Sequence, residues 1–272
     1  MPITQIKLKR GDFAMSDKIG GETVKYEVKD HIATITLNRP EKRNAINRPM
    51  RKEIEQAFKD VKYNDDVWVA IITGNGPVFC AGKDLLEPRK EEDGIVMSND
   101  QVYEFHRNIY KPFICALNGP CYAQGGGFAL NSDVIIMAEN ASLGWPQVMR
   151  GISSVSGPVM AAKNMPWQTA MAHMLRAKPI PAEVCHQFGM CNEVVTIDEL
   201  MPSALRWAEE INGCAPLAVR AIKEAARRGW DMNYREQVYL ARDIADRVLH
   251  SADAKEGIDA FREKRQPVWK GE

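Results

Sequence analysis

The sequence predicts an α/β fold of the α+β type, in which a β-rich core is followed by a helical C-terminal region. Alternating apolar and polar residues near the start of the chain are typical of strands, and a unit of strand, strand and helix then recurs about three times up to residue 138. Beyond Ser156 the strand patterns fade and helical spacings dominate. The recurrence suits a coiled stack of strand–strand–helix turns as well as a doubly wound sheet.

The composition limits the classes of function. With 272 residues the chain is long enough for one large domain or two modest ones. Lysine plus arginine equals aspartate plus glutamate at 36 each, so no net charge favours nucleic acid or an anionic membrane as a partner. The sequence contains neither an apolar run of about 18 residues nor the apolar core of a signal peptide, so we expect no membrane partner and a cytoplasmic protein.

The cysteines predict neither a disulfide framework nor a metal site. They form no CxxC pair, and each lies among apolar or small residues. We therefore expect reduced thiols in the core or in turns. The six positions are Cys80, Cys115, Cys121, Cys185, Cys191 and Cys214.

The N-terminal part of the chain predicts a hairpin, a helix and a strand. Residues 1–20 show no sustained period and are interpreted as a loose leader, within which Met15 is an alternative start. Alternation over 24–28 and again over 31–37 predicts a β-hairpin. Pro49 suits the first turn of a helix whose apolar positions continue to Val61, and a strand is expected over 68–73.

The middle of the chain predicts alternating strands and helices around a glycine-rich turn. Residues 87–100 are charged and aperiodic, which predicts a mobile loop. The elements expected after it are a helix at 101–110, a strand at 112–117, a short extended segment at 121–123, a buried helix that Gly125 to Gly127 open and that runs to Ser132, and a strand at 134–138.

The C-terminal part is predicted to be helical and to form an interface. Helices are expected from Pro181, over 198–208, from Pro216, over 233–249 and through Phe261. We divide the chain into the leader at 1–20, a core at 21–213 and a helical region at 214–272. The helical region and its approach contain more aromatic mass than isolated helices can bury, which indicates an oligomer interface. The aromatic residues concerned are Trp207, Tyr234, Tyr239 and Phe261.

The glycine-rich turn is the strongest local signal of function. Three consecutive glycines at 125–127 leave the backbone open to a close ligand because they have no Cβ. A helix that starts there presents unpaired N–H groups and the positive end of its dipole. Such a corner suits the stabilisation of an oxyanion, although a run of glycines alone is also typical of an ordinary tight turn.

Four motifs together resemble the crotonase family, also called the enoyl-CoA hydratase/isomerase superfamily. They are Leu37-Asn-Arg-Pro-Glu-Lys-Arg-Asn-Ala45, Phe79-Cys-Ala-Gly-Lys-Asp84, Asn118-Gly-Pro-Cys-Tyr-Ala-Gln-Gly-Gly-Gly127 with Asp133, and Gly257-Ile-Asp-Ala-Phe-Arg-Glu-Lys-Arg265. The resemblance covers about residues 22–270. It implies a crotonase-like spiral of ββα repeats followed by a C-terminal helical trimerisation region, assembled as a homotrimer or a dimer of trimers.

The resemblance also implies an acyl-CoA substrate and no tightly bound cofactor. In the family, two backbone amides bind the thioester oxygen, and these positions fall on Lys83 and Gly126. Each such donor contributes about 3–4 kcal/mol to the stabilisation of an enolate or tetrahedral intermediate. Coenzyme A, as part of the substrate, is expected to contact residues of the 41–45 loop, the 81–84 loop and the tail. These residues are Lys42, Arg43, Ala45, Ala81, Asp84, Phe261 and Lys264.

The sequence departs from the family at its acid–base positions. The two glutamates of family hydratases correspond to Ala129 and Gln147, and neither side chain can take a proton from water at neutral pH. The aspartate of dienoyl isomerases corresponds to Val155, and the tyrosine of a decarboxylase branch is missing near Ser154. The identity of the general acid or base is therefore open.

A short set of side chains is left near the expected acyl pocket. Gln147 and Glu87 are the candidates for a catalytic role, Gln147 as a hydrogen-bonding group and Glu87 as a carboxylate, although Glu87 is also consistent with a solvated loop acid. Weaker candidates are the hydroxyls of Tyr122, Ser153 and Ser154, a histidine, His106, that is more often packed, and Asp133, which is expected to support the glycine corner. An apolar lining is expected from Trp145, Met149 and Met160.

Three functional hypotheses follow. The first is hydration or isomerisation of an enoyl-CoA, which is the majority reaction of the family. The second keeps the oxyanion hole for decarboxylation or for C–C or thioester hydrolysis. The third is a non-catalytic acyl-CoA-binding protein, because the acid–base pair is missing.

Overall fold

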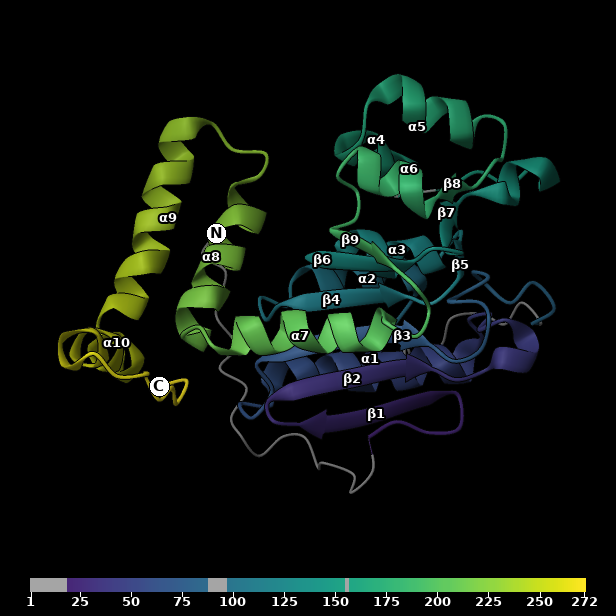
Figure 1. The fold of residues 1–272 in the computed structure, drawn as a ribbon. Helices are drawn as coiled ribbons and strands as arrows, with labels where there is room; N and C mark the ends of the chain where they lie inside the picture. The colour runs from purple at the N-terminus through teal and green to yellow at the C-terminus, as the bar shows by residue number, and fades with distance from the viewer. Residues whose placement is uncertain (1–18, 88–96, 155–156) are drawn as a thin grey trace.

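The computed structural model describes residues 19–87, 97–154 and 157–272 (Figure 1). The expected leader at 1–20 lies almost wholly outside the described residues, as do most of the expected loop at 87–100 and Val155. All other elements can be compared with the sequence-based expectations.

The larger sheet has six strands in the order β1-β2-β3-β4-β6-β9. β1 and β2 form the expected antiparallel hairpin, and every later neighbour is parallel. β4 and the first four residues of β3 are continuously apolar and buried, as expected of parallel strands covered on both faces. The bounds are β1 Val24–Lys29, β2 Ile32–Leu37, β3 Val69–Gly74, β4 Phe113–Leu117, β6 Val134–Ala138 and β9 Glu193–Val195.

A second sheet of three short strands runs in the order β5-β7-β8. Its strands are β5 Pro120–Tyr122, β7 Ser142–Gly144 and β8 Ile180–Pro181. From β4 to β7 the chain alternates between the two sheets, and the larger sheet grows in chain order without a reversal. This arrangement selects the coiled stack of strand–strand–helix turns, and the doubly wound alternative is wrong.

The helices that the sequence predicts lie close to their expected positions, and η1, η2, α4 and α5 occur in addition. They are η1 Pro40–Lys42, α1 Arg48–Tyr63, α2 Asn99–Arg107, α3 Gly125–Asn131, η2 Pro146–Arg150, α4 Gly157–Asn164, α5 Trp167–Met174, α6 Ala182–Gln187, α7 Leu200–Asn212, α8 Pro216–Gly229, α9 Tyr234–Leu249 and α10 Ala252–Glu263. The side chain of Asn47 caps α1, and Ser98 and Gln101 form a capping box on α2. No helix within the described ranges is long and apolar enough to cross a membrane.

Strands β8 and β9 lie beyond Ser156, in the part of the chain where the strand patterns fade and helices were expected to dominate. Each has at most three residues, which is too short to show a period of two along the sequence. β9 forms because its backbone pairs with β6 at the edge of the larger sheet. Tertiary pairing, and not local pattern, creates these strands.

The helices divide into a part that covers the sheet and a part that extends from it. Figure 1 shows α7 across the near face of the larger sheet and α1, α2 and α3 behind it, whereas α9 and α10 extend away at the left. On the extending helices Tyr234, Tyr239 and Phe261 are exposed, as expected. Trp207 is an exception, because it is half-buried on α7 and donates a hydrogen bond to Glu193.

Candidate functional site

The glycine corner joins β5 to α3 at the carboxyl end of the parallel strands. The three glycines form the first turn of α3, as expected of the buried helix that they open, and all are buried. A Cβ on Gly127 would lie 2.6 Å from the Tyr103 ring, and one on Gly126 would lie 3.1 Å from Cζ2 of Trp145. The close packing of the Tyr103 and Trp145 rings is therefore one reason for glycine at these positions, and the approach of a ligand would be a second.

The 79–84 loop lies directly against this corner. The Cys80 carbonyl accepts the Tyr122 N–H at 2.8 Å. Gly82 has a φ of +93°, and a Cβ there would lie 2.9 Å from Cβ of Ala123 and 3.3 Å from the Gln124 nitrogen. The two motifs, which are about 40 residues apart in the sequence, thus share several backbone contacts, including donation of the Phe79 N–H to the Pro120 carbonyl at 3.1 Å.

The loop at 39–46 supports the other side of the 79–84 loop. Asn44 is fully buried with a φ of 53°, and its amide donates to the carbonyls of Asn75 and Val78 at 2.9 and 2.8 Å. Arg39 donates to the Ala45 carbonyl at 2.5 Å and pairs with Asp84 at 3.3 Å. These contacts hold the two loops in register.

The backbone amide of Lys83 points away from the supporting loop. Ile46 donates to the Gly82 carbonyl at 2.8 Å and accepts from Asp84 at 2.9 Å, so Gly82 and Asp84 use the groups that face Ile46. Because backbone groups alternate along an extended segment, the Lys83 N–H faces the opposite side, and it makes no hydrogen bond within the described residues. The Gly126 N–H donates to the Ala123 carbonyl at 3.2 Å, which is long for such a bond.

The structure brings most of the expected coenzyme A residues together, but not those of the tail. Ala81 donates to the Arg43 carbonyl at 3.0 Å, and Lys42 and Arg43 are exposed at the end of η1. The Arg39 guanidinium donates to both the Ala45 carbonyl and the Asp84 carboxylate and so links these two residues.

Phe261 and Lys264 lie elsewhere in the same chain. The segment after α10 packs near the start of β3, where Gly271 approaches Trp68. The glycine corner is at the carboxyl end of the strands, and Figure 1 shows α10 at the opposite side from α3 and β5. Phe261 is 86% exposed. A contact of these two residues with coenzyme A therefore stays a prediction for the site of a neighbouring subunit.

Two of the expected candidates, Glu87 and His106, make contacts away from the corner. The Glu87 carboxylate accepts the Arg48 N–H at 2.7 Å at the start of α1, and Ala129 is fully buried in α3. His106 packs against Phe58 and Phe113, with ring centroids 4.6 and 4.3 Å away. Burial and, to a lesser extent, the charges of Lys223 and Arg227 hold the pKa of His106 well below its ordinary value, so it is neutral.

Three uncharged polar atoms of the corner and of the segment that follows β7 are buried without a hydrogen-bond partner within the described residues. They are Nε1 of Trp145, Oε1 of Gln147 and Oε1 of Gln124. Gln124 is the residue before the three glycines, and Trp145 contacts the second of them. A buried polar atom without a partner costs about 1–3 kcal/mol, and five further such atoms lie elsewhere among the described residues, on Arg51, His106, Asn212 and Arg220.

The opposite end of α3 is held by charged groups. The carboxylate of Asp133 accepts the Phe113 N–H at 2.8 Å and pairs with Lys223 at 2.5 Å and with Arg227 at 3.4 Å. Arg227 also donates to the Asn131 carbonyl at 2.9 Å. Asp133 thus ties α8 to the end of α3, which refines its expected supporting role.

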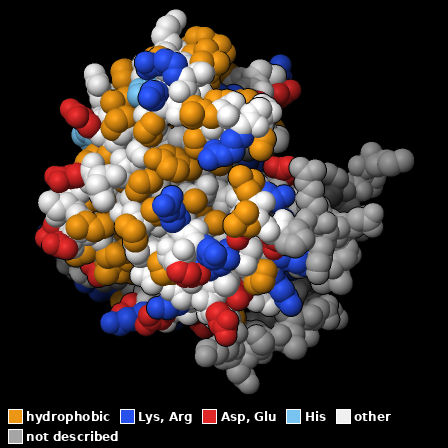
Figure 2. Space-filling view, turned by 90° about the vertical axis from the view of Figure 1, so that its right-hand side faces the viewer, with side chains coloured by type: hydrophobic (Ala, Val, Ile, Leu, Met, Phe, Trp, Pro, Cys, Tyr) orange, Lys and Arg blue, Asp and Glu red, His pale blue; other side chains and the backbone are white. Residues whose placement is uncertain are grey.

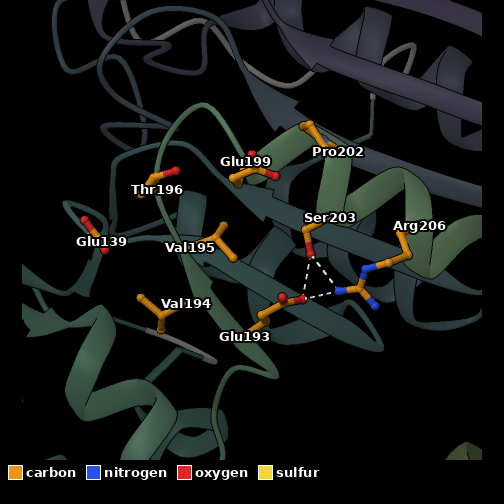
Figure 3. A pocket seen from close by; sticks show the side chains of 9 residues that line it. All are labelled: Glu139, Glu193, Val194, Val195, Thr196, Glu199, Pro202, Ser203 and Arg206. Atoms are coloured by element: carbon orange, nitrogen blue, oxygen red, sulfur yellow. Dashed lines mark hydrogen bonds and ion pairs between the residues drawn. The ribbon is translucent and has the colours of Figure 1, made fainter.

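A separate open hollow lies between β9 and α7 (Figure 3). Ser203, Arg206 and Trp207 all donate to Oε2 of Glu193 at 2.6, 2.7 and 2.9 Å. The hydrogen bonds from Ser203 and Trp207, together with the charge of Arg206, lower the pKa of Glu193. None of the expected site residues lines this hollow. Because the Glu193 carboxylate already accepts three hydrogen bonds from α7, we assign it a structural role.

The expectations from sequence missed two features of the site. Asn44 was expected only as a member of a motif, although asparagine is one of the few residues that readily adopt the left-handed backbone conformation found here. Trp145 was expected only as apolar lining, because no sequence pattern shows whether an indole N–H finds a partner.

With this geometry in place, comparison with known proteins defines the class. The sequence model of the enoyl-CoA hydratase/isomerase family matches residues 27–272. The chain belongs to this family, the crotonase superfamily, and the expected crotonase-like fold is confirmed.

Named relatives span nearly the whole chain. Mevalonyl-coenzyme A hydratase of Aspergillus fumigatus is 34% identical over 88% of this chain and 92% of its own length. Carnitinyl-CoA dehydratase of Proteus mirabilis is 37% identical over 88% of this chain and 95% of its own. The crystal structure of an enoyl-CoA hydratase from Mycobacterium tuberculosis H37Rv superposes with a TM-score of 0.85 at 32% identity, covering 93% of this chain and 100% of that one.

Proposed function

We propose that the protein is an acyl-CoA enzyme that stabilises a thioester enolate with the backbone amides of Lys83 and Gly126. The observation that carries the proposal is the contact of Gly82 with Ala123 and Gln124, together with the unpaired Lys83 N–H. Two amides from different segments then donate hydrogen bonds to the thioester oxygen. The Gly126 amide has only a long competing hydrogen bond to the Ala123 carbonyl.

We propose hydration or isomerisation of an enoyl-CoA as the reaction type. Membership of the family and the names of relatives that hydrate or dehydrate CoA thioesters support it. Ala129 and Gln147 favour a second candidate, decarboxylation or C–C or thioester hydrolysis, in which charge on the substrate or a water replaces the glutamate base. A binding protein without catalysis is the third outcome to test.

Coenzyme A is proposed to lie along the paired loops at 42–45 and 81–84. The exposed cations Lys42 and Arg43 provide charge for its phosphates. The carboxylate of Asp84 forms an ion pair with Arg39, so we expect Asp84 to stabilise the loop conformation as well as to contact the ligand.

A homotrimer, or a dimer of trimers, is proposed as the assembly. Figure 2 shows apolar side chains gathered on one face of the molecule. Exposed apolar residues occur on α4, α5 and η2, among them Val159, Trp167 and Met149, and again on α8 to α10. Two different apolar regions on one chain suit a ring with head-to-tail contacts, and light scattering of the purified protein tests it.

The decisive experiment removes the backbone N–H of residue 83 and compares this variant with one that changes only the side chain. Lys83→Pro lacks the N–H, whereas Lys83→Ala keeps it. We expect Lys83→Pro to lower thioester turnover by about 10²–10³-fold and Lys83→Ala to stay within a few-fold of wild type. Mass spectrometry of a panel of acyl-CoA thioesters, scored for gain of water or loss of carbon dioxide, identifies the reaction first. Equal activity in both variants contradicts the oxyanion proposal.

A further inference from the structure

The turn that leads into the three glycines contains a strained backbone position. Ala123 has a φ of 50°, in the left-handed region that residues other than glycine rarely adopt. Its carbonyl accepts the Gly126 N–H at 3.2 Å, and the Gln124 carbonyl accepts the Gly127 N–H at 3.0 Å. A strained conformation persists only where surrounding groups hold it. The direction of the Gly126 N–H therefore depends on what holds Ala123 and Gln124 in place.

Two hydrogen bonds from other elements hold this turn. The Ala123 N–H donates to the Gly144 carbonyl of β7 at 2.8 Å. The hydroxyl of Tyr103, on α2, donates to the Gln124 carbonyl at 2.5 Å. Within the described part of the chain, this is the only side-chain hydrogen bond to the backbone of Ala123 or Gln124. Tyr103 thus fixes the peptide group that directly precedes the glycines.

Packing determines where the Tyr103 hydroxyl lies. A Cβ on Gly127 would lie 2.6 Å from Cε1 of the Tyr103 ring, and the Phe128 ring packs against it edge-on with the centroids 5.3 Å apart. Burial raises the pKa of the Tyr103 hydroxyl well above its ordinary range, so the group stays protonated at neutral pH. The ring therefore presents a fixed donor to Gln124.

We propose that Tyr103 is a positioning residue for the oxyanion hole, because its hydroxyl holds the Gln124 carbonyl and so fixes the direction of the Gly126 N–H. Tyr103 acts through the turn at 123–124 and not by contact with the thioester. The inference rests on the proposed function, because it takes the Gly126 amide as a donor to the thioester oxygen. It adds α2 to the segments that build the site, through a side chain 21 residues before Gln124.

The first test measures how strongly the bound thioester carbonyl is polarised. Butyryl-CoA with an isotope-labelled thioester carbon is bound to the protein, and infrared difference spectroscopy records the carbonyl stretching frequency. Hydrogen bonds from two amides lower this frequency, because they draw electron density from the C=O bond onto the oxygen. In Tyr103→Phe, which keeps the ring and lacks the hydroxyl, we expect a smaller lowering than in wild type.

Steady-state kinetics provide a second readout of the same variant. A misaligned donor weakens the stabilisation of the transition state more than the binding of the substrate. With the thioester that wild type turns over, we expect kcat of Tyr103→Phe to fall about 10-fold, which is less than for the loss of a whole donor. KM should change less than about threefold.

Two further variants separate positioning from stability. Tyr26→Phe is the matched control, because the Tyr26 hydroxyl also donates at 2.5 Å, to the Asp60 carboxylate, and lies on β1 at the edge of the larger sheet. This control should keep the wild-type carbonyl frequency and kcat. Tyr103→p-aminophenylalanine keeps a weaker donor at the same place and should give an intermediate frequency. It provides the test if Tyr103→Phe does not fold.

The outcomes distinguish failure of the inference from failure of the proposed function. Wild-type frequency and kcat in both variants at position 103 overturn the inference, as do equal losses in Tyr103→Phe and Tyr26→Phe. If binding to wild type does not lower the carbonyl frequency of butyryl-CoA, the oxyanion hole itself is overturned, and with it the proposed function.

Discussion

The two ends of α3 are built in opposite ways. Its N-terminal end contains only glycines and uncharged neighbours, and Oε1 of Gln124 and Nε1 of Trp145 there have no partner within the described residues. Just beyond its C-terminal end, Asp133 accepts a backbone hydrogen bond and pairs with two cations, while Arg227 also binds the Asn131 carbonyl. One short helix thus has an unsatisfied end and a fully satisfied end.

The difference separates a binding function from a structural one. Unpaired polar atoms at the glycine end cost stability but are available to a ligand. Paired charges at the other end fix α3 to α8 and hence the core to the C-terminal helices. Substitutions at the two ends should accordingly affect different measurements.

The largest effect on stability is expected from Asp133→Ala. Lys223 is nearly buried and also donates to the Lys111 carbonyl at 2.8 Å, so it cannot leave when its partner is lost. Because Asp133 itself is exposed, its loss should cost less than that of a fully buried ion-pair partner, about 1–3 kcal/mol, measured as the free energy of unfolding in denaturant titrations.

The double variant Asp133→Ala with Lys223→Met serves as the control for this pair. It removes both charges, so it should be more stable than Asp133→Ala alone. If the double variant is as unstable as the sum of the single ones, the two residues do not act as a pair.

A smaller effect, on activity and not on stability, is expected from Gly126→Ala. The added methyl meets the Trp145 ring at 3.1 Å and shifts the corner by a fraction of an ångström. Turnover of the active thioester should fall by up to about 10²-fold. The free energy of unfolding should change by less than about 2 kcal/mol, because the gain in helix propensity offsets part of the crowding.

Gly229→Ala is the matched control for Gly126→Ala. Its methyl would make an ordinary contact with Gln237 at 3.4 Å, at the end of α8. We expect unchanged turnover. A loss of activity in this control would mean that crowding at the corner is not the cause.

The smallest effect concerns pH and His106, which lies near Lys223 and Arg227. Its pKa is lowered in the folded protein from an ordinary value of 6.5, so the unfolded state binds a proton that the folded state does not. As pH falls below 6.5, wild type should lose about 1.4 kcal/mol per pH unit relative to His106→Phe.

Denaturant titrations at pH 8 and pH 5.5 check this, with pH 8 as the control because His106 is neutral in both states there. Parallel stability curves for the two proteins across this range would contradict a neutral buried His106.

Most elements of the fold follow from local patterns. The hairpin at β1 and β2, the helix after Pro49 and the helix that Pro216 starts were predicted because alternation and helix-start residues are local signals. β8 and β9 were not predictable, because two or three residues form a strand only when a partner edge is present. The choice between a coil and a doubly wound sheet also depended on strand order.

The site was predictable in its backbone and not in its side chains. The motifs around Lys83 and Gly126 identified two segments, and the structure shows that they touch through Gly82. Whether Glu87 is free or caps a helix, and whether Trp145 has a partner, depends on neighbours that are distant in sequence.

The sequence by itself determined the family, the order of the elements before residue 140 and the absence of glutamate at Ala129 and Gln147, since these depend on residue type and spacing alone. The tertiary structure decided the contact between the two loops, the separation of Phe261 from its own corner and the unpaired N–H of Trp145. These features depend on which atoms become neighbours when the coil closes, because a hydrogen-bond donor is satisfied or left unpaired by its surroundings and not by its type.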